Sequence, residues 1–281
     1  MLSRSGLERL LSRGLAGALR RVLPPRMRVG VRERLEVVGR LDTDAAEVWL
    51  AADSLFEYDV RLRSCRKEPG TVRWITEHVR AGDVVYDVGA NVGAYTLLAA
   101  RRAPGRVRVY AFEPSFSNYA QLCRNVILNR CDAVVFPLPV ALSDVTVLDA
   151  LHHRTLVTGA AMHAFGRPEA SAGEAFEAAY RQPALGYRLD DLVAQFGLPI
   201  PDHIKIDVDG LEARVLAGAE RTLKESRLRT VLVEVLAGSA SEASIATKLT
   251  TAGLRQVSAE RFPLAGGQVA YNALWAREET A

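Results

Sequence analysis

The chain has 281 residues, of which 49% are hydrophobic and 25% are charged, and its formal net charge is +3. This length exceeds the roughly 200 residues that one sheet-and-helix core needs, is short for two full domains, and comes with ample apolar content for a core. No apolar stretch approaches the roughly 18 residues that span a bilayer and no secretory leader is evident, so we expect a cytoplasmic protein.

Residues 1–34 form a basic head with nine arginines against two glutamates. Between residues 7 and 22, apolar side chains fall on one half of a helical wheel with arginines opposite, which predicts an amphipathic helix ending at Pro24-Pro25. Such a helix could contact an anionic membrane surface, dock a carrier or nucleic acid, or pack on its own domain or a second copy of the chain. We assign residues 1–65 to this helix and an extension, and residues 66–281 to the main domain.

A helix is expected directly after Pro69, a residue that suits a first helical turn. Trp74, Ile75 and His78 recur there at helical spacing, so this helix should lie against the sheet. The carboxylate of Glu68, just before the helix, could point into a cleft or satisfy the positive end of the helix dipole.

The most informative stretch runs from Asp83 to Thr96, where a β-branched apolar run breaks into a glycine turn and then a helical segment. Gly89 and Gly93 let the backbone bend sharply and let a ligand come close. Asp87 ends the strand on the ligand side. A carboxylate at that point disfavours a phosphate but attracts a cationic sulfonium or ammonium. We therefore infer that the ligand is S-adenosylmethionine.

Two further strand ends should face the same ligand. A second strand over residues 106–112 ends at Glu113, which lies 26 residues beyond Asp87 and could accept hydrogen bonds from both hydroxyls of a ribose. A third apolar run leads to Ser143 and Asp144, which could bind an adenine amino group. Three loops then surround one cofactor.

Helical segments at residues 94–102 and 118–129 alternate with these strands, and later strands are expected at 203–208 and 230–235 around a helix at 211–224. This alternation predicts an α/β fold with a mostly parallel, Rossmann-like sheet and helices on both faces. A last pair of strands, at 254–258 and 268–275, could close the sheet as an antiparallel edge hairpin. That edge separates methyltransferase sheets from the dinucleotide-binding type.

Residues 145–188 are longer than one crossover helix requires, which is typical of a lid or substrate wall. This insertion contains His152, His153 and His163. One of them could act as a base or metal ligand, or all could be wall residues without chemistry. The three cysteines have no metal-ligand spacing, and we interpret them as reduced structural thiols: Cys65, Cys123 and Cys131.

The fourth strand ends in two acids, Asp207 and Asp209, at a position where ligand crevices lie in open α/β sheets. Asp207 could hold the methionine amino group, accept a proton from a substrate hydroxyl, or bind a divalent cation, and we rank the roles in that order. For Asp209 and Glu212 a role in stabilising the loop is an equal alternative. Glu234 ends the fifth strand in the same crevice.

Several motifs occur in a fixed order along residues 66–235: Asp87-Val-Gly-Ala-Asn-Val-Gly-Ala-Tyr-Thr96, Phe112-Glu-Pro, Ala141-Leu-Ser-Asp144, Leu189-Asp-Asp-Leu192 and Lys205-Ile-Asp-Val-Asp-Gly-Leu-Glu212. Together they resemble the FkbM family of S-adenosylmethionine-dependent methyltransferases. The resemblance implies a class I methyltransferase fold. It also implies O-methylation of a sugar or polyketide hydroxyl in bacterial natural-product or glycan synthesis, with S-adenosylhomocysteine as the product.

Carried over residue by residue, the resemblance and the loops around it give a cofactor site of thirteen positions: Glu68, Asp87, Gly89, Ala90, Asn91, Gly93, Tyr95, Thr96, Glu113, Pro114, Ser143, Asp144 and Asp207. In-line methyl transfer to a hydroxyl oxygen needs a group that takes the proton, and the catalytic candidates are Asp207, Asp209 and His152. No metal ligands are assigned, and a need for a divalent metal stays open. The basic head and the insertion would choose the acceptor.

Three other functions compete with this interpretation. Methylation of RNA or protein would use the basic head as a docking arm, but the rest of the chain is net acidic and lacks interleaved aromatic and basic residues. A nicotinamide oxidoreductase is disfavoured because Asp87 and Asn91 spoil a phosphate-binding glycine pattern. A non-catalytic scaffold would bind the cofactor without turnover. We expect a small-molecule acceptor, no nucleic acid, and peripheral membrane contact or homodimerisation through residues 1–34.

Overall fold

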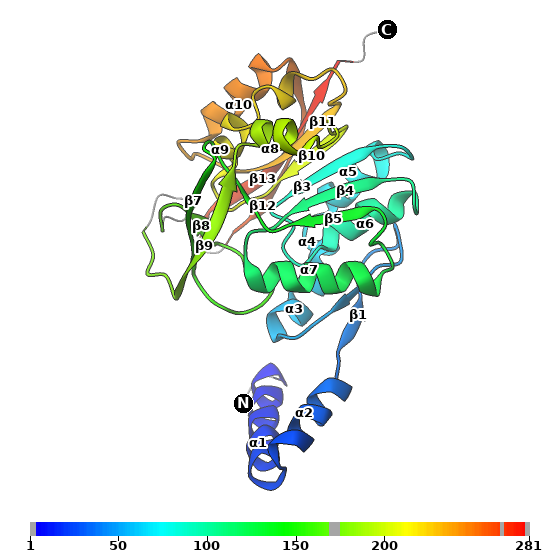
Figure 1. Cartoon of the computed structure of the whole chain (residues 1–281), viewed down its shortest axis with the longest axis vertical. Helices are drawn as coiled ribbons and strands as arrows, with labels where there is room; N and C mark the ends of the chain where they lie inside the picture. The colour runs from blue at the N-terminus through cyan, green and yellow to red at the C-terminus, as the bar shows by residue number, and fades with distance from the viewer. Residues whose placement is uncertain (1–3, 169–174, 265–266, 279–281) are drawn as a thin grey trace. The chain divides into compact units, whose positions relative to one another are not determined.

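A central sheet of seven strands organises the larger part of the chain in the computed structural model, which describes residues 4–168, 175–264 and 267–278 (Figure 1). The strand order is β12-β13-β11-β10-β3-β4-β5. The five strands from β11 to β5 run parallel: β11 (Thr230–Leu236), β10 (His203–Ile206), β3 (Val84–Val88), β4 (Arg108–Phe112) and β5 (Val135–Leu138).

The remaining two strands form the antiparallel edge that the sequence predicted. β13 (Val269–Arg277) pairs antiparallel with β11, and β12 (Leu254–Pro263) pairs antiparallel with β13. The expected fold class, a mostly parallel α/β sheet with an antiparallel edge, is therefore confirmed. The chain order reverses between the central neighbours β3 and β10, which is where ligands bind in open α/β sheets.

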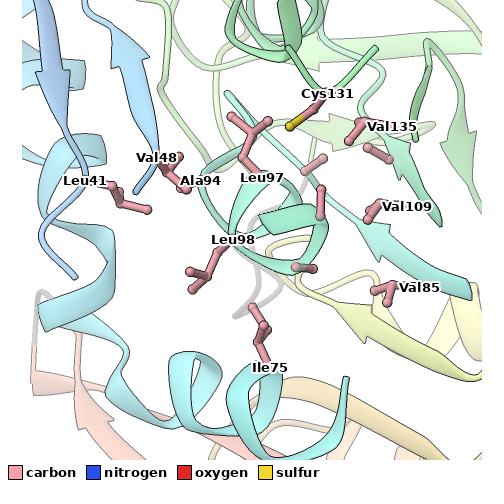
Figure 2. Packing of buried hydrophobic residues seen from close by; sticks show 14 of the residues in the cluster. Leu41, Val48, Ile75, Val85, Ala94, Leu97, Leu98, Val109, Cys131 and Val135 are labelled. Atoms are coloured by element: carbon pink, nitrogen blue, oxygen red, sulfur yellow. The ribbon is translucent and has the colours of Figure 1, made fainter. Parts of the chain in front are cut away.

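Helices cover both faces of this sheet because the central strands are apolar on both sides. One cluster joins Val85 and Val109 to helices α5 (Pro69–His78), α6 (Ala94–Arg102) and α7 (Phe116–Leu128), and Figure 2 shows part of it. Val84 and Tyr86, on either side of Val85 in β3, belong to the cluster on the opposite face of the sheet. That cluster includes α8 (Leu189–Phe196), α9 (Glu212–Ala217) and α10 (Glu242–Thr251). Successive strand side chains point to opposite faces, so a continuous apolar run fills two cores.

One predicted helix is shorter than expected. The segment expected as a helix over 211–224 contains α9 and then a separate 3₁₀ turn, η2 (Thr222–Lys224). Gly218 ends α9, and a Cβ at that position would overlap the Ser143 carbonyl oxygen. The close approach of two backbones there stops the helix after Ala217.

The chain divides into two compact units, residues 1–38 and residues 39–281. The sequence analysis placed the boundary at 65/66. Residues 39–65 pack with the larger unit because Leu41, Leu50 and Leu62 are buried in its first apolar cluster. The elements of this stretch are β1 (Val38–Arg40), β2 (Trp49–Ala51), α3 (Leu55–Asp59), η1 (Arg61–Arg63) and α4 (Ser64–Lys67).

The smaller unit consists of two helices, α1 (Arg4–Val22) and α2 (Pro25–Arg34), separated at Pro24-Pro25 as the sequence predicted. Pro25 starts α2. Proline is tolerated there because the N–H that it lacks would have no hydrogen-bond partner in the first turn of a helix. Among the helices in the described ranges, none combines the length and apolar character needed to cross a membrane.

The insertion, together with residues 141–142 just before it, forms a small second sheet, which the sequence did not predict. Its order is β6-β9-β7-β8, and its strands are β6 (Ala141–Leu142), β7 (Val147–His153), β8 (Ala164–Phe165) and β9 (Tyr180–Tyr187). Residues 169–174 of the expected lid lie outside the described part. Between β7 and β8, residues 154–163 run without regular structure.

Candidate active site

A cleft of about 400 Å³ opens at the carboxyl ends of the central parallel strands. The loops after β3, β4 and β10 contribute to it, and so do Glu234 within β11, the insertion and the segment around η1. Its volume lies within the range of small-molecule sites. Seven of the residues that the sequence predicted for the site line this cleft: Glu68, Gly89, Asn91, Glu113, Pro114, Asp207 and Asp209.

The glycine turn after β3 brings two strand ends together. Gly89 has a φ of +83°, and a Cβ there would overlap the Asp207 carbonyl oxygen at the end of β10. The Gly89 and Ala90 N–H groups donate to the Phe112 carbonyl oxygen at 3.0 and 3.1 Å. The turn is therefore fixed against β10 on one side and β4 on the other.

Gly93 has a different role in the same loop. It precedes α6 with a φ of +92°, and a Cβ there would lie 2.6 Å from Leu122 Cδ1 of α7. It does not belong to the described cleft lining. Glycine at this position therefore lets α6 start close to α7, so it supports the loop from behind.

A buried charge group lies beneath the turn. Lys205 Nζ donates to Asp207 Oδ2 at 2.9 Å and lies 3.9 Å from Asp87 Oδ1. Thr96 Oγ1 donates to Asp87 Oδ2 at 2.5 Å, while Asp87 Oδ1 is buried without a hydrogen-bond partner. Tyr95 completes the group, because its ring lies 5.2 Å from Lys205 Nζ and its hydroxyl donates to a backbone carbonyl.

This arrangement sets the charge of the group. Burial alone would lower the pKa of Lys205, but the carboxylates of Asp207 and Asp87 outweigh it and raise that pKa. Burial alone would also raise the pKa of Asp207, but the Lys205 ammonium holds it below its usual value. Asp87 is more deeply buried, and its pKa is raised. Asp207 therefore presents an ionised carboxylate to the cleft.

Glu113 holds the glycine loop and faces the cleft. Its Oε2 accepts the Asn91 N–H at 2.8 Å and its Oε1 accepts the Ser115 N–H at 2.9 Å. Burial outweighs these two hydrogen bonds and raises the pKa of Glu113 to about 7. A buried carboxylate of this kind gains from further hydrogen-bond donors, which ribose hydroxyls would supply.

Three more acids lie near this edge of the sheet, two after β10 and one within β11. Asp209 has a φ of +54° and accepts the Met162 N–H at 2.6 Å, and burial followed by repulsion from Asp207 raises its pKa to about 6. Glu212 accepts the Val208 and Gly210 N–H groups at 3.1 and 3.0 Å, so it stabilises the loop. Glu234 lines the cleft, and burial followed by Asp207 raises its pKa to about 9.

Residues 157–163 form a strap along the cleft, held by side chains from distant parts of the chain. Asn91 and Asn118 each donate to the Ala160 carbonyl oxygen at 3.0 Å. Asn118 also accepts the Gly159 N–H at 2.8 Å, and Arg61 Nε donates to the Gly159 carbonyl oxygen at 2.6 Å. The hydrogen bond from Met162 to Asp209 fixes the far end. Because Ala160 and Met162 line the cleft, the strap forms one of its walls.

The histidine that lines the cleft is His163, whereas the sequence analysis chose His152. His152 is buried in the insertion sheet, and its Nε2 lies 3.1 Å from the Gly166 carbonyl oxygen. The ring of His163 packs against that of His153 with centroids 4.6 Å apart and planes tilted by 49°, and its Nδ1 is buried without a hydrogen-bond partner. Burial, followed by His153, lowers the pKa of His163 to about 4, so its ring is neutral at pH 7.

Two predicted cofactor residues are directed elsewhere. Ser143 Oγ donates to Asp144 Oδ1 at 3.0 Å, and Arg214 of α9 donates to the same oxygen at 2.9 Å. In the described lining, Ala141 and Leu142 of β6 take the place next to the cleft. The assignment of Ser143 and Asp144 to the adenine therefore stays a prediction that these contacts do not support.

The residues of the cleft fit S-adenosylmethionine. The turn at Gly89 approaches the end of β10 so closely that there is no room for a Cβ. Glu113 offers a buried hydrogen-bond acceptor, and Asp207 offers an ionised carboxylate for an ammonium group. Asp87 Oδ1 is buried beneath the loop without a hydrogen-bond partner, 3.9 Å from Lys205 Nζ. Within residues 4–168, 175–264 and 267–278, no three histidine, cysteine or acidic side chains are grouped to hold a metal ion.

The sequence analysis missed the contribution of Arg61, Lys67 and the strap to this cleft. Arg61 lies in a stretch that was assigned to an extension, and it carries no motif. Asn118 was expected only as the first residue of the helical segment 118–129. No sequence signal separates His163 from its neighbours, because the pairing of β7 with β8 decides which histidine reaches the cleft.

Comparison with known proteins identifies the family of this chain. A family model described as "Methyltransferase FkbM domain" matches residues 87–253. The chain is 31% identical over 207 residues to the 31-O-demethyl-FK506 methyltransferase FkbM of Streptomyces tacrolimicus, covering 67% of this chain and 78% of the relative.

A second relative is the hexuronic acid methyltransferase AglP of Haloferax volcanii, at 27% identity, with 68% of this chain and 74% of the relative covered. Among solved structures, the METTL16 MTase domain matches with a TM-score of 0.50 at 15% identity, covering 82% of this chain and 74% of that chain. At that identity the match speaks for the fold alone.

Proposed function

This chain belongs to the FkbM family of S-adenosylmethionine-dependent methyltransferases, and from that premise we propose that it methylates a hydroxyl group of a small-molecule or sugar acceptor. The observation that carries the proposal is the cleft in which the Gly89 turn, Glu113 and Asp207 lie together. The relatives support the acceptor class, since one is named for a 31-O-demethyl compound and another for a hexuronic acid.

When bound, S-adenosylmethionine supplies a methyl carbon on a positively charged sulfur. The acceptor oxygen would bond to that carbon as the carbon–sulfur bond breaks, and the hydroxyl proton would pass to a base. The protein's tasks are to hold both partners, exclude water and receive the proton.

We assign the binding of the cofactor to Glu113 and Asp207. Glu113 would accept the ribose hydroxyls, and Asp207 would hold the methionine ammonium. Lys205 keeps Asp207 ionised, which favours binding a cation and makes Asp207 a weak proton acceptor. Of the three roles ranked for Asp207, we therefore propose the first, holding the methionine amino group.

We assign the base to Asp209. Its pKa of about 6 is close to neutral pH, where a general base works best, and it lines the cleft beside the strap. His163 offers a neutral ring nitrogen that could orient the acceptor hydroxyl. Glu234, with a pKa of about 9, is protonated at neutral pH and can donate a hydrogen bond to an acceptor oxygen.

Two measurements test the proposal. Calorimetric titration with S-adenosylmethionine, S-adenosylhomocysteine and NAD should show binding of the first two alone. A panel of sugars and macrolides, assayed for S-adenosylhomocysteine release, should then yield a methylated hydroxyl. Binding of NAD would contradict the proposal. Methylation only at nitrogen atoms, or only of RNA, would also contradict it.

The variant Asp209→Asn separates binding from chemistry. We expect turnover to fall by about 100-fold or more with cofactor affinity unchanged, because the base is lost and the binding residues stay. Asp132→Asn removes a carboxylate that is exposed on the surface and should leave both quantities unchanged. Full turnover by Asp209→Asn would sink the assignment of the base.

A further inference from the structure

The two-helix unit of residues 1–38 exposes an apolar stripe. Leu11, Leu15 and Val22 of α1 are 63%, 63% and 77% exposed. They recur at spacings of four and seven residues, which places them on one face of the helix. Among the described side chains of this unit, none is buried.

The inner side of the helix pair does not account for this stripe. Leu19 of α1, Leu23 just after it and Val31 of α2 line the hollow between the helices and are half-buried there. Leu11 and Leu15 do not belong to that lining. The stripe is therefore an apolar surface that the helix pair itself leaves without a partner.

The rest of the unit is strongly basic. Residues 1–34 carry nine arginines and two glutamates, whereas the whole chain has a net charge of only +3. Arg13 and Arg20 are exposed and, by helical spacing, lie on the side of α1 away from the stripe. Helices with an apolar face and an arginine-rich polar face lie in the plane of anionic membranes, with the arginine stems reaching up to the headgroups.

We propose that residues 4–34 bind the surface of a bilayer rich in anionic phospholipid. The apolar stripe would enter the headgroup boundary, and the arginines would contact lipid phosphates. Charge decides for this occupant, since a second copy of the unit carries the same excess of arginines and would be repelled. The length of α1, 19 residues without a continuous apolar run, suits a helix lying on the membrane.

The test is co-sedimentation of the full chain with lipid vesicles. Vesicles of equal parts phosphatidylglycerol and phosphatidylcholine should bring down the protein at low salt and release most of it at molar salt, because screening weakens surface charge contacts. Pure phosphatidylcholine vesicles should bind far less. Sedimentation without vesicles controls for aggregation.

Two double variants separate the apolar and the electrostatic contributions. Leu11→Ser with Leu15→Ser should lower partition into the anionic vesicles by about 100-fold. Arg13→Gln with Arg20→Gln should lower it by roughly 30-fold.

Matched controls make the same exchanges on the larger unit. Ile127→Ser with Leu148→Ser removes two exposed apolar side chains, and Arg106→Gln with Arg108→Gln removes the same charge. Both controls should bind vesicles like the unchanged chain. Thermal unfolding followed by circular dichroism checks that all variants fold.

Several results would overturn the proposal. One is the absence of vesicle binding by the unchanged chain, and another is equal binding to neutral and anionic vesicles. Light scattering that shows a dimer lost in the Leu11→Ser and Leu15→Ser variant, without vesicle binding, would identify a second copy as the partner. RNA binding without vesicle binding would identify nucleic acid as the partner. The test uses no cofactor or acceptor, so its outcome is independent of the proposed activity.

Discussion

The affinity for S-adenosylmethionine should depend on pH through Glu113. The carboxyl group is buried and has a pKa of about 7 without ligand. If the ribose is held by the ionised form, each protonated molecule must lose a proton before it binds. For a pKa of about 7, the dissociation constant should then rise about tenfold between about pH 8 and about pH 6.

Other groups around the cleft titrate in or near this range, so the variant Glu113→Gln isolates the effect. Asp209 and Glu212 have pKa values of about 6 and about 7 and stay in place in the variant. Asp207 stays ionised throughout, because Lys205 lowers its pKa. The variant should bind at least about tenfold more weakly at pH 8, since one charge-assisted hydrogen bond is worth about 1.5 to 3 kcal/mol. It should also lose most of the pH dependence.

Calorimetry in two buffers of different ionisation enthalpy measures both effects, because it counts the protons released on binding. The unchanged chain should release up to about one proton near pH 6, and Glu113→Gln should release fewer. An affinity that is constant from pH 6 to 8 would refute the reasoning. So would an equal pH dependence in the variant.

The same pKa has a consequence for stability, with a definite sign. The folded pKa of Glu113 is about 7 and the ordinary value is 4.5, so the folded protein holds this proton more tightly. Its contribution is fully present below pH 4.5 and is lost as the pH rises through 7, by about 3 kcal/mol. Unfolding by urea at several pH values should show a smaller loss for Glu113→Gln.

Three further variants test the architecture of the site. Lys205→Met should lower the free energy of unfolding by about 3 to 5 kcal/mol, because it leaves buried carboxylates without their cation, and a loss below about 1 kcal/mol in urea unfolding would contradict the pairing. Gly89→Ala should cost more than about 3 kcal/mol, whereas Gly105→Ala, which also has a positive φ but meets open space, should cost about 1 to 2 kcal/mol. Asn118→Ala should free the strap and speed cleavage by protease within residues 157–163, as mass spectrometry of the fragments would show, and unchanged cleavage would argue against its role.

The central sheet was predictable because its signal is local. Three of the parallel strands are short runs followed directly by a glycine or an acid: β3 by Gly89, β4 by Glu113 and β10 by Asp207. Parallel strands align their carboxyl ends at one edge, so these positions had to meet wherever the strands paired. The antiparallel edge was predictable too, because the last two β-prone segments are also visible as local patterns in the sequence.

The walls of the cleft were not predictable, because they depend on long-range pairing. The choice between His152 and His163 follows from the register of β7 and β8, in which His152 faces Ala164 across the strands. A shift by one residue would exchange the two faces of β7. Arg61 reaches the cleft only because the preceding segment packs on the first apolar cluster.

The proposed cofactor loop and the strap are joined at Asn91. Its backbone N–H is held by Glu113, the proposed ribose ligand, and its side-chain amide holds the Ala160 carbonyl oxygen of the strap. Asp209, the proposed base, accepts the N–H of Met162, two residues further along the strap. The strap is therefore held at its middle by the loop that Glu113 fixes and towards its carboxyl end by the proposed base. Because it forms a wall of the cleft, its sequence is where differences in acceptor choice within this fold would be expressed.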